Sequence, residues 1–167
     1  MDISTPSPIV AAPGLQATAY VIEYARGRFL ALPPHVTVAI AEQPRVVAVP
    51  GAPYYACGLM DWQGQGQEQW LPLIHMESLI AAYPCHKPEQ PRYALVVAWQ
   101  PAPGEPVQHG ALVLDELPQT VTVTNELACA LPSDSDLWPE LSLSCFSHAE
   151  QAVPILDSSV VFGRSHD

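Results

Sequence analysis

Proline and glycine divide this chain into short apolar segments, and that spacing limits what it can fold into. Its 167 residues include 19 prolines and 9 glycines, and the apolar segments between them recur about every ten residues. Proline lacks a backbone donor and glycine favours turns, so most segments are too short for a stable helix. The pattern predicts a mainly β domain, built as barrels or as a sandwich.

The opening segment, residues 18–32, predicts two strands joined by a tight turn at Arg26 and Gly27, because glycine adopts the positive φ that such turns need. Residues 101–106, PAPGEP, form a second turn signal between two apolar segments that we expect to pair as a hairpin. For residues 33–37 a short helical turn competes with a strand. The remaining predicted strands alternate or are continuously apolar: 36–40, 45–49, 92–99, 109–117, 120–124, 141–145 and 152–156.

One helix is predicted, at residues 75–83. Met76, Leu79, Ile80 and Tyr83 recur at i, i+3, i+4 and i+7 and therefore share one face, and Pro84 ends the segment. The helix is about two turns long.

The charge balance excludes two classes of partner. The chain has six Lys and Arg residues and seventeen Asp and Glu residues, which gives a net charge of −11. Lys87 is the sole lysine. Nucleic acid and anionic membrane surfaces would be repelled. Charged residues make up 14% of the chain, against about 25% in ordinary soluble domains. A surface with few charges suits docking to other proteins, although a composition rich in proline and alanine explains it equally well.

Residues 1–16 contain three prolines and small side chains, so we predict a flexible segment there. The folded domain is expected at residues 17–163, followed by a short tail at 164–167. No export signal and no run of about 18 apolar residues is present, which predicts a cytoplasmic protein without membrane insertion. In that compartment the four scattered cysteines are expected to be reduced thiols: Cys57, Cys85, Cys129 and Cys145.

The candidate catalytic residues do not form a convincing set. Cys85 and His86 are adjacent, and neighbouring side chains of an extended strand point to opposite faces. Cys145, His148 and Asp157 have the types of a nucleophile, a base and an orienting acid, but a triad is defined by geometry. The six histidines lack metal-ligand spacing. No catalytic residue, metal or cofactor is predicted, and a small cysteine-dependent enzyme is the alternative from another class.

Four segments carry a resemblance to a known family. Residues 49–53 read VPGAP, and 58–64 read GLMDWQG, which matches the pattern "G, two apolar, N, x, R, G". Residues 72–76 read PLIHM, which matches "P, apolar, apolar, D, L", and 110–117 read GALVLDEL. In this order, after the opening hairpin, they resemble the CheW-like domain, an adaptor of bacterial chemosensory systems. The resemblance covers residues 18–162.

The resemblance implies two intertwined SH3-like β-barrels that share one hydrophobic seam, with short helices at the edges. Members of the family are not enzymes. They join the cytoplasmic tip of a chemoreceptor to the regulatory domain of a CheA-like histidine kinase, which places them at membrane-associated receptor arrays. The implied contact residues are Val36, Val38, Gly58, Asp61, Trp62, Gln63 and Gly64.

Within this resemblance, residues 49–72 are expected to form the loop-bearing face of the first barrel. Trp62 or Trp70 could anchor a partner there, with filling of the core as the alternative for Trp62.

The departures from the family pattern bear on receptor binding. Gln63 stands in place of the family arginine and Asp61 in place of its asparagine. Val38 replaces a frequent glutamate, and His75 replaces the aspartate of the second motif. Residues 65–71 form a stretch about four residues longer than usual, which a surface loop would absorb easily.

These departures suggest a divergent adaptor for an accessory pathway, such as the PilI-like control of type IV pili. A decoy that binds the kinase without bridging to a receptor is the alternative, and a structural module that works without any kinase is another.

Overall fold

Two sheets build the fold, as described by a computed structural model for residues 16–64 and 66–163. The five-stranded sheet, here called the terminal barrel, has the strand order β10 (Ser142–His148), β11 (Gln151–Leu156), β2 (Arg28–Leu32), β1 (Gln16–Ala25), β9 (Gln119–Thr124). The six-stranded sheet, the central barrel, has the order β3 (Thr37–Glu42), β7 (Tyr93–Trp99), β8 (Gln108–Leu114), β6 (Gln67–Ile74), β5 (Ala56–Gly64), β4 (Val46–Val47). The predicted mainly β class with two intertwined small barrels is confirmed.

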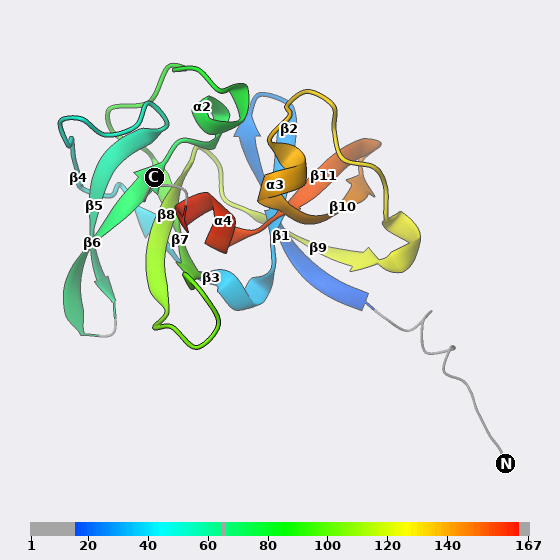
Figure 1. Cartoon of the computed structure of the whole chain (residues 1–167), viewed down its shortest axis with the longest axis horizontal. Helices are drawn as coiled ribbons and strands as arrows, with labels where there is room; N and C mark the ends of the chain where they lie inside the picture. Colours follow the sequence, from blue (N-terminus) through cyan, green and yellow to red (C-terminus); the bar gives the residue numbers. More distant parts are fainter. Residues whose placement is uncertain (1–15, 65, 164–167) are drawn as a thin grey trace, which may run out of the picture.

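The two barrels are intertwined because both ends of the chain contribute to one of them. The chain makes β1 and β2, runs through the six strands of the central barrel, and returns for β9, β10 and β11. Figure 1 shows β4, β5 and β6 on one side of the molecule and β9, β10 and β11 on the other. Parallel pairings, β6 with β8 and β11 with β2, connect segments that are distant in sequence.

Three hydrophobic cores explain the sequence pattern of the central strands. In β7, Ala94 and Val96 point into the central barrel, whereas Leu95, Val97 and Trp99 point into the seam between the barrels. β8 alternates in the same way, so both strands are apolar on both faces. In these two strands the side chains that enter the barrel, Ala and Val, are smaller on average than those that enter the seam. The seam core also includes residues from β1, β2, β6, β11 and the helices, and a third core fills the terminal barrel.

The opening hairpin is confirmed, with the turn at Arg26 and Gly27, where Gly27 has φ of 72°. Glu23 Oε2 accepts a hydrogen bond from the Gly27 amide at 2.8 Å. The helical turn predicted at 33–37 and the strand predicted at 36–40 both occur, because a 3₁₀ turn, η1 (Pro34–Val36), leads directly into β3.

The predicted helix is shorter than expected. It is α2 (Met76–Ala81), and Ala82 follows in the left-handed region with φ of 62°. Met76, Leu79 and Ile80 are buried as predicted. The prediction for Tyr83 is wrong: it lies beyond the turn at Ala82 and is 61% exposed.

Two further predictions are corrected. The predicted loop-bearing face at residues 49–72 holds only for 49–55, which connect β4 to β5, because β5 and β6 pair from Ala56↔Ile74 to Gly64↔Gln67 in the central barrel. The predicted surface loop at 65–71 is, from Gln67 onward, part of strand β6. Three short helical elements were not predicted: η2 (Asn125–Leu127), α3 (Trp138–Leu141) and α4 (Ser158–Gly163).

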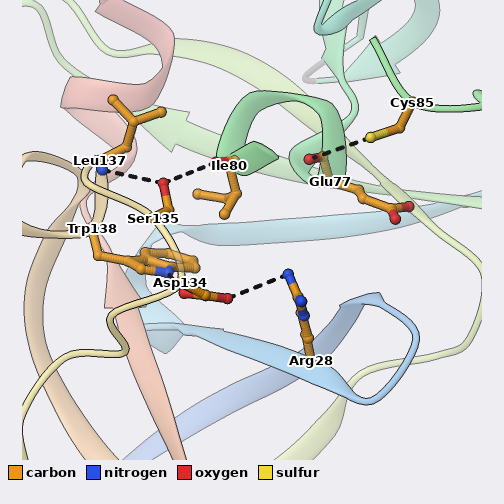
Figure 2. Close-up of polar contacts among 8 residues, drawn as sticks. All are labelled: Arg28, Glu77, Ile80, Cys85, Asp134, Ser135, Leu137 and Trp138. Carbon is orange, nitrogen blue, oxygen red and sulfur yellow. Dashed lines mark hydrogen bonds and ion pairs between the residues drawn. The ribbon is translucent and has the colours of Figure 1, made fainter. Parts of the chain in front are cut away.

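Polar contacts hold residues 134–141, here called the α3 segment, against the rest of the fold (Figure 2). Trp138 is fully buried, and its Nε1 donates to Asp134 Oδ1 at 2.9 Å. Asp134 also forms an ion pair with Arg28 of β2 at 3.4 Å. Ser135 Oγ donates to the carbonyl of Ile80, the last turn of α2, at 2.8 Å.

Residues 1–15 of the predicted flexible segment and the predicted tail at 164–167 lie outside the described residues, and Gln16 already belongs to β1. Within the residues described, no helix has the length and apolar character needed to cross a bilayer.

Candidate docking surfaces

An apolar groove of about 370 Å³ lies between the two barrels. Strand β3 forms one wall, Tyr20 of β1 contributes from the terminal barrel, and Leu117 and Pro118 come from the link between β8 and β9. The alternation of β3 sends Ala39 and Ala41 into the central barrel, whereas its exposed residues, Val38, Ile40 and Glu42, face outward. Here this surface is called the inter-barrel groove.

The groove exposes more apolar surface than isolated side chains would. Val38 is 45% exposed, Ile40 43% and Leu117 56%. Strand β3 also ends the six-stranded order, so it pairs with β7 along one side only. Clustered apolar side chains beside the end strand of a sheet are typical of protein docking sites.

A second surface lies on the outer face of the β5–β6 hairpin, called here the hairpin face. Asp61 and Trp70 are directly opposite each other in the register. The Arg45 guanidinium forms an ion pair with Asp61 at 3.1 Å and lies 5.4 Å from the centre of the Trp70 ring. Gln63 follows Asp61 on the same face and is exposed. The hairpin face therefore presents a cation, an amide and an indole.

Three of the residues that the resemblance implies as contacts lie on the inner side of the hairpin. Gly58 and Gly64 are buried, and Trp62 packs against the core of the central barrel with its ring 5.2 Å from that of His109. A Cβ at Gly64 would overlap the Trp62 indole, and a Cβ at Gly58 would overlap the backbone of Val47. These residues shape the hairpin from inside.

The other four implied residues lie on outer surfaces or beside them. Asp61 and Gln63 lie on the hairpin face, and Val38 lies in the inter-barrel groove. Val36, in η1, is half-buried against the seam core. The structure thus divides the seven residues among two surfaces and two cores.

Of the residues that line the inter-barrel groove, only Val38 was predicted as a contact. Ile40 shares the outward face of β3 with Val38, so the alternation of residues 36–40 was a usable signal. Tyr20 and Leu117 are distant in sequence and lacked such a signal.

A polar cavity of about 550 Å³ lies beside α2, and His75 contributes to its lining. Ser78 Oγ accepts a hydrogen bond from the Cys85 amide at 3.0 Å and lies 2.8 Å from His75 Nδ1. A buried hydrogen bond therefore joins the Ser78 hydroxyl to the His75 imidazole. Burial lowers the pKa of His75, although Glu77 acts in the opposite direction.

Three of the candidate catalytic groups, Cys145, Asp157 and Cys85, contact other groups of the fold. Cys145 Sγ lies 3.7 Å from Cys129 Sγ and 3.6 Å from the carbonyl of Ala130. Asp157 Oδ1 accepts from the Ser159 amide at 3.1 Å, at the start of α4. Cys85 Sγ approaches backbone carbonyls of Glu77 and Tyr83 (Figure 2 shows the first). Across residues 16–64 and 66–163, no group of three or more His, Cys, Asp or Glu side chains is placed to hold a metal ion.

No family model and no curated protein matches the sequence. Among solved structures, the chain is similar to the scaffolding protein TtCheW from Thermoanaerobacter tengcongensis, with a TM-score of 0.64 and 12% identity over 85% of this chain and 84% of that chain. The fold is CheW-like. At this level of identity the similarity establishes the architecture, and it agrees with the two barrels and shared seam that the motif order predicted.

Proposed function

We propose that this protein is a non-enzymatic chemosensory adaptor, which couples a chemoreceptor tip to the regulatory domain of a histidine kinase by docking. The observation that carries the proposal is the exposed apolar inter-barrel groove on a CheW-like fold. Docking needs no reacting group, and Cys145 and Asp157 form contacts within the fold. The protein would act in the cytoplasm, at membrane-associated receptor arrays.

An adaptor that bridges two proteins needs two separable surfaces. The inter-barrel groove is apolar, with Val38, Ile40 and Leu117 exposed. The hairpin face is amphipathic, and an exposed indole next to a cation is typical of interface anchors. We propose that one partner binds each surface, with Val38 central to the first and Gln63 and Trp70 central to the second.

Arg45 supports a bridging role despite the absence of arginine at position 63. Its side chain is 68% exposed and lies on the same face as Gln63. The cation expected of the family is therefore present on this face from a neighbouring strand end. A shifted cation would suit a partner from a specialised pathway, such as control of type IV pili.

The ion pair of Arg45 with Asp61 favours the second candidate, a decoy that binds the kinase without bridging to a receptor. Asp61 neutralises the guanidinium at 3.1 Å, and Gln63 offers one amide where a guanidinium has five donors. In the decoy, Gln63→Arg would create receptor binding. In the adaptor, receptor binding exists already and the substitution changes it little.

Binding titrations test the proposal with the full chain, a receptor tip and a kinase regulatory domain from the same cell. Val38→Asp is expected to weaken binding of one partner by roughly tenfold or more, and Trp70→Asp that of the other. Val107→Asp is the matched control, since Val107 is 54% exposed and lies outside both surfaces. Absence of binding to both partners would refute the adaptor, and the decoy as well.

A further inference from the structure

Cys129 and Cys145 lie together at the place where the terminal barrel closes. In that sheet β9 and β10 are the two end strands. The segment that follows β9 and η2 reaches β10 through the bridge Ala128↔Phe146, and the Cys129 amide donates to the Cys145 carbonyl at 3.1 Å. This bridge and this backbone hydrogen bond join the two ends of the sheet across the closure.

The geometry of the two thiols suits a covalent bond. Because Ala128 pairs with Phe146, Cys129 stands directly opposite Cys145 and its side chain lies on the same face. Opposed residues of antiparallel strands have Cα atoms about 4.5–5.5 Å apart, within the range that disulfides span. The two Sγ atoms are 3.7 Å apart, and both cysteines are free thiols.

We propose that Cys129 and Cys145 form a reversible disulfide that locks the closure of the terminal barrel, with a low-molecular-weight disulfide as the oxidant. The two thiols differ in exposure, and this difference sets the order of the chemistry. Cys129 is exposed and can meet the oxidant, whereas Cys145 is 7% exposed. Burial, together with Cys129, raises the pKa of Cys145 to about 12, so Cys145 acts second.

The reaction proceeds as two thiol–disulfide exchanges. The Cys129 thiolate attacks one sulfur of the oxidant, a protein mixed disulfide forms, and one small thiolate leaves. Cys145 then gives its proton to solvent, and its sulfur attacks Cys129 Sγ, which releases the second small thiolate. The protein loses two electrons and two protons, and the oxidant is reduced to two thiols.

The bond would enclose the α3 segment in a loop. The chain between the two cysteines carries Asp134, which forms an ion pair with Arg28 of β2, and Ser135, which donates to the Ile80 carbonyl of α2 (Figure 2). Cross-linking residues 16 positions apart restricts the unfolded chain. We expect the oxidised protein to melt about 5–10 °C above the reduced one.

Oxidised glutathione, alkylation under denaturing conditions and peptide mass mapping test this on the full chain. The expected product is a 129–145 cross-link that leaves Cys57 and Cys85 open to alkylation. Cys145→Ser should stop at a glutathione adduct on Cys129. The control, Cys57→Ser with Cys85→Ser, should form the cross-link as the wild type does.

Three results would overturn the inference. A stable glutathione adduct on wild-type Cys129 would show that Cys145 does not complete the exchange. A cross-link through Cys57 or Cys85 would show that another pair is preferred. A 129–145 disulfide that leaves the melting temperature unchanged would remove its role in locking the barrel. None of these results depends on the proposed adaptor function.

Discussion

At Gly58 the backbone of a neighbouring strand occupies the space that a side chain would need. A Cβ there would overlap the carbonyl oxygen of Val47, and the φ of Gly58 is +135°. Gly64 has a comparable reason, since the Trp62 indole lies where its Cβ would be. The sequence resemblance identified both glycines but assigned them to a docking face. A glycine motif does not reveal whether a partner or a neighbouring strand approaches the backbone.

The first prediction follows from this overlap. Gly58→Ala should lower the free energy of unfolding by about 2–4 kcal/mol, because both the φ and the contact with Val47 are unfavourable for alanine. Gly104→Ala is the control: Gly104 has φ of +85° but open space around it, so its cost should be about 1 kcal/mol. Urea unfolding measures both. Equal costs would show that β4 does not approach Gly58 as closely as described.

His75 gives a prediction about pH. Its pKa in the folded protein is lowered from 6.5, mainly by burial. Below pH 6.5 the unfolded chain therefore binds the proton first, and stability falls as the pH falls toward the folded-state pKa. Glu77, Asp115, Lys87 and His86 act on the same imidazole, and Glu77 and Asp115 reduce the shift.

The test compares His75→Asn with the wild type by urea unfolding between about pH 7.5 and pH 5. Asparagine keeps an acceptor for Ser78 but does not titrate, so the variant should lose less stability on acidification. His35→Asn, at an exposed position, should follow the wild type. A His75→Asn variant with an unchanged pH dependence would contradict the burial of a neutral imidazole.

At the scale of elements, prediction succeeded where a strand is buried on both faces. Residues 92–99 and 109–117 have continuous apolar runs because they face both the barrel and the seam, and they pair as the predicted hairpin, although β8 ends at Leu114. The β5–β6 hairpin was missed because its glycines and glutamines suggest a loop. The alternation of Met60 and Trp62 inward with Asp61 and Gln63 outward was the available signal.

The short α3 helix depends on tertiary contacts, which explains why its sequence did not predict it. Trp138→Phe should lower the free energy of unfolding by about 1–3 kcal/mol, since it removes buried volume and the hydrogen bond to Asp134. Trp70→Phe is the matched control, because Trp70 lies on the outer hairpin face, and should cost less than about 0.5 kcal/mol. Similar losses for both variants in thermal or urea unfolding would contradict the anchoring of α3 by Trp138.

For the whole molecule, motif order predicted the architecture better than it predicted the surfaces. The segments alone left barrels or a sandwich open, and it was their resemblance to the CheW-like domain that implied two barrels with a shared seam. The inter-barrel groove combines Tyr20, β3 and Leu117, which come together only through the nested path of the chain. The low share of charged residues fits either protein docking or a composition rich in proline and alanine. The clustering of exposed Val38, Ile40 and Leu117 favours docking.

The central claim is that the protein works by binding partners at the inter-barrel groove and the hairpin face. Amide hydrogen exchange of the full chain, with a receptor tip or a kinase regulatory domain from the same cell, tests it most directly. The account predicts slower exchange in β3 and residues 115–118 with one partner, and in β5 and β6 with the other. Unchanged exchange with both partners, or protection confined to the polar cavity around His75, would contradict it.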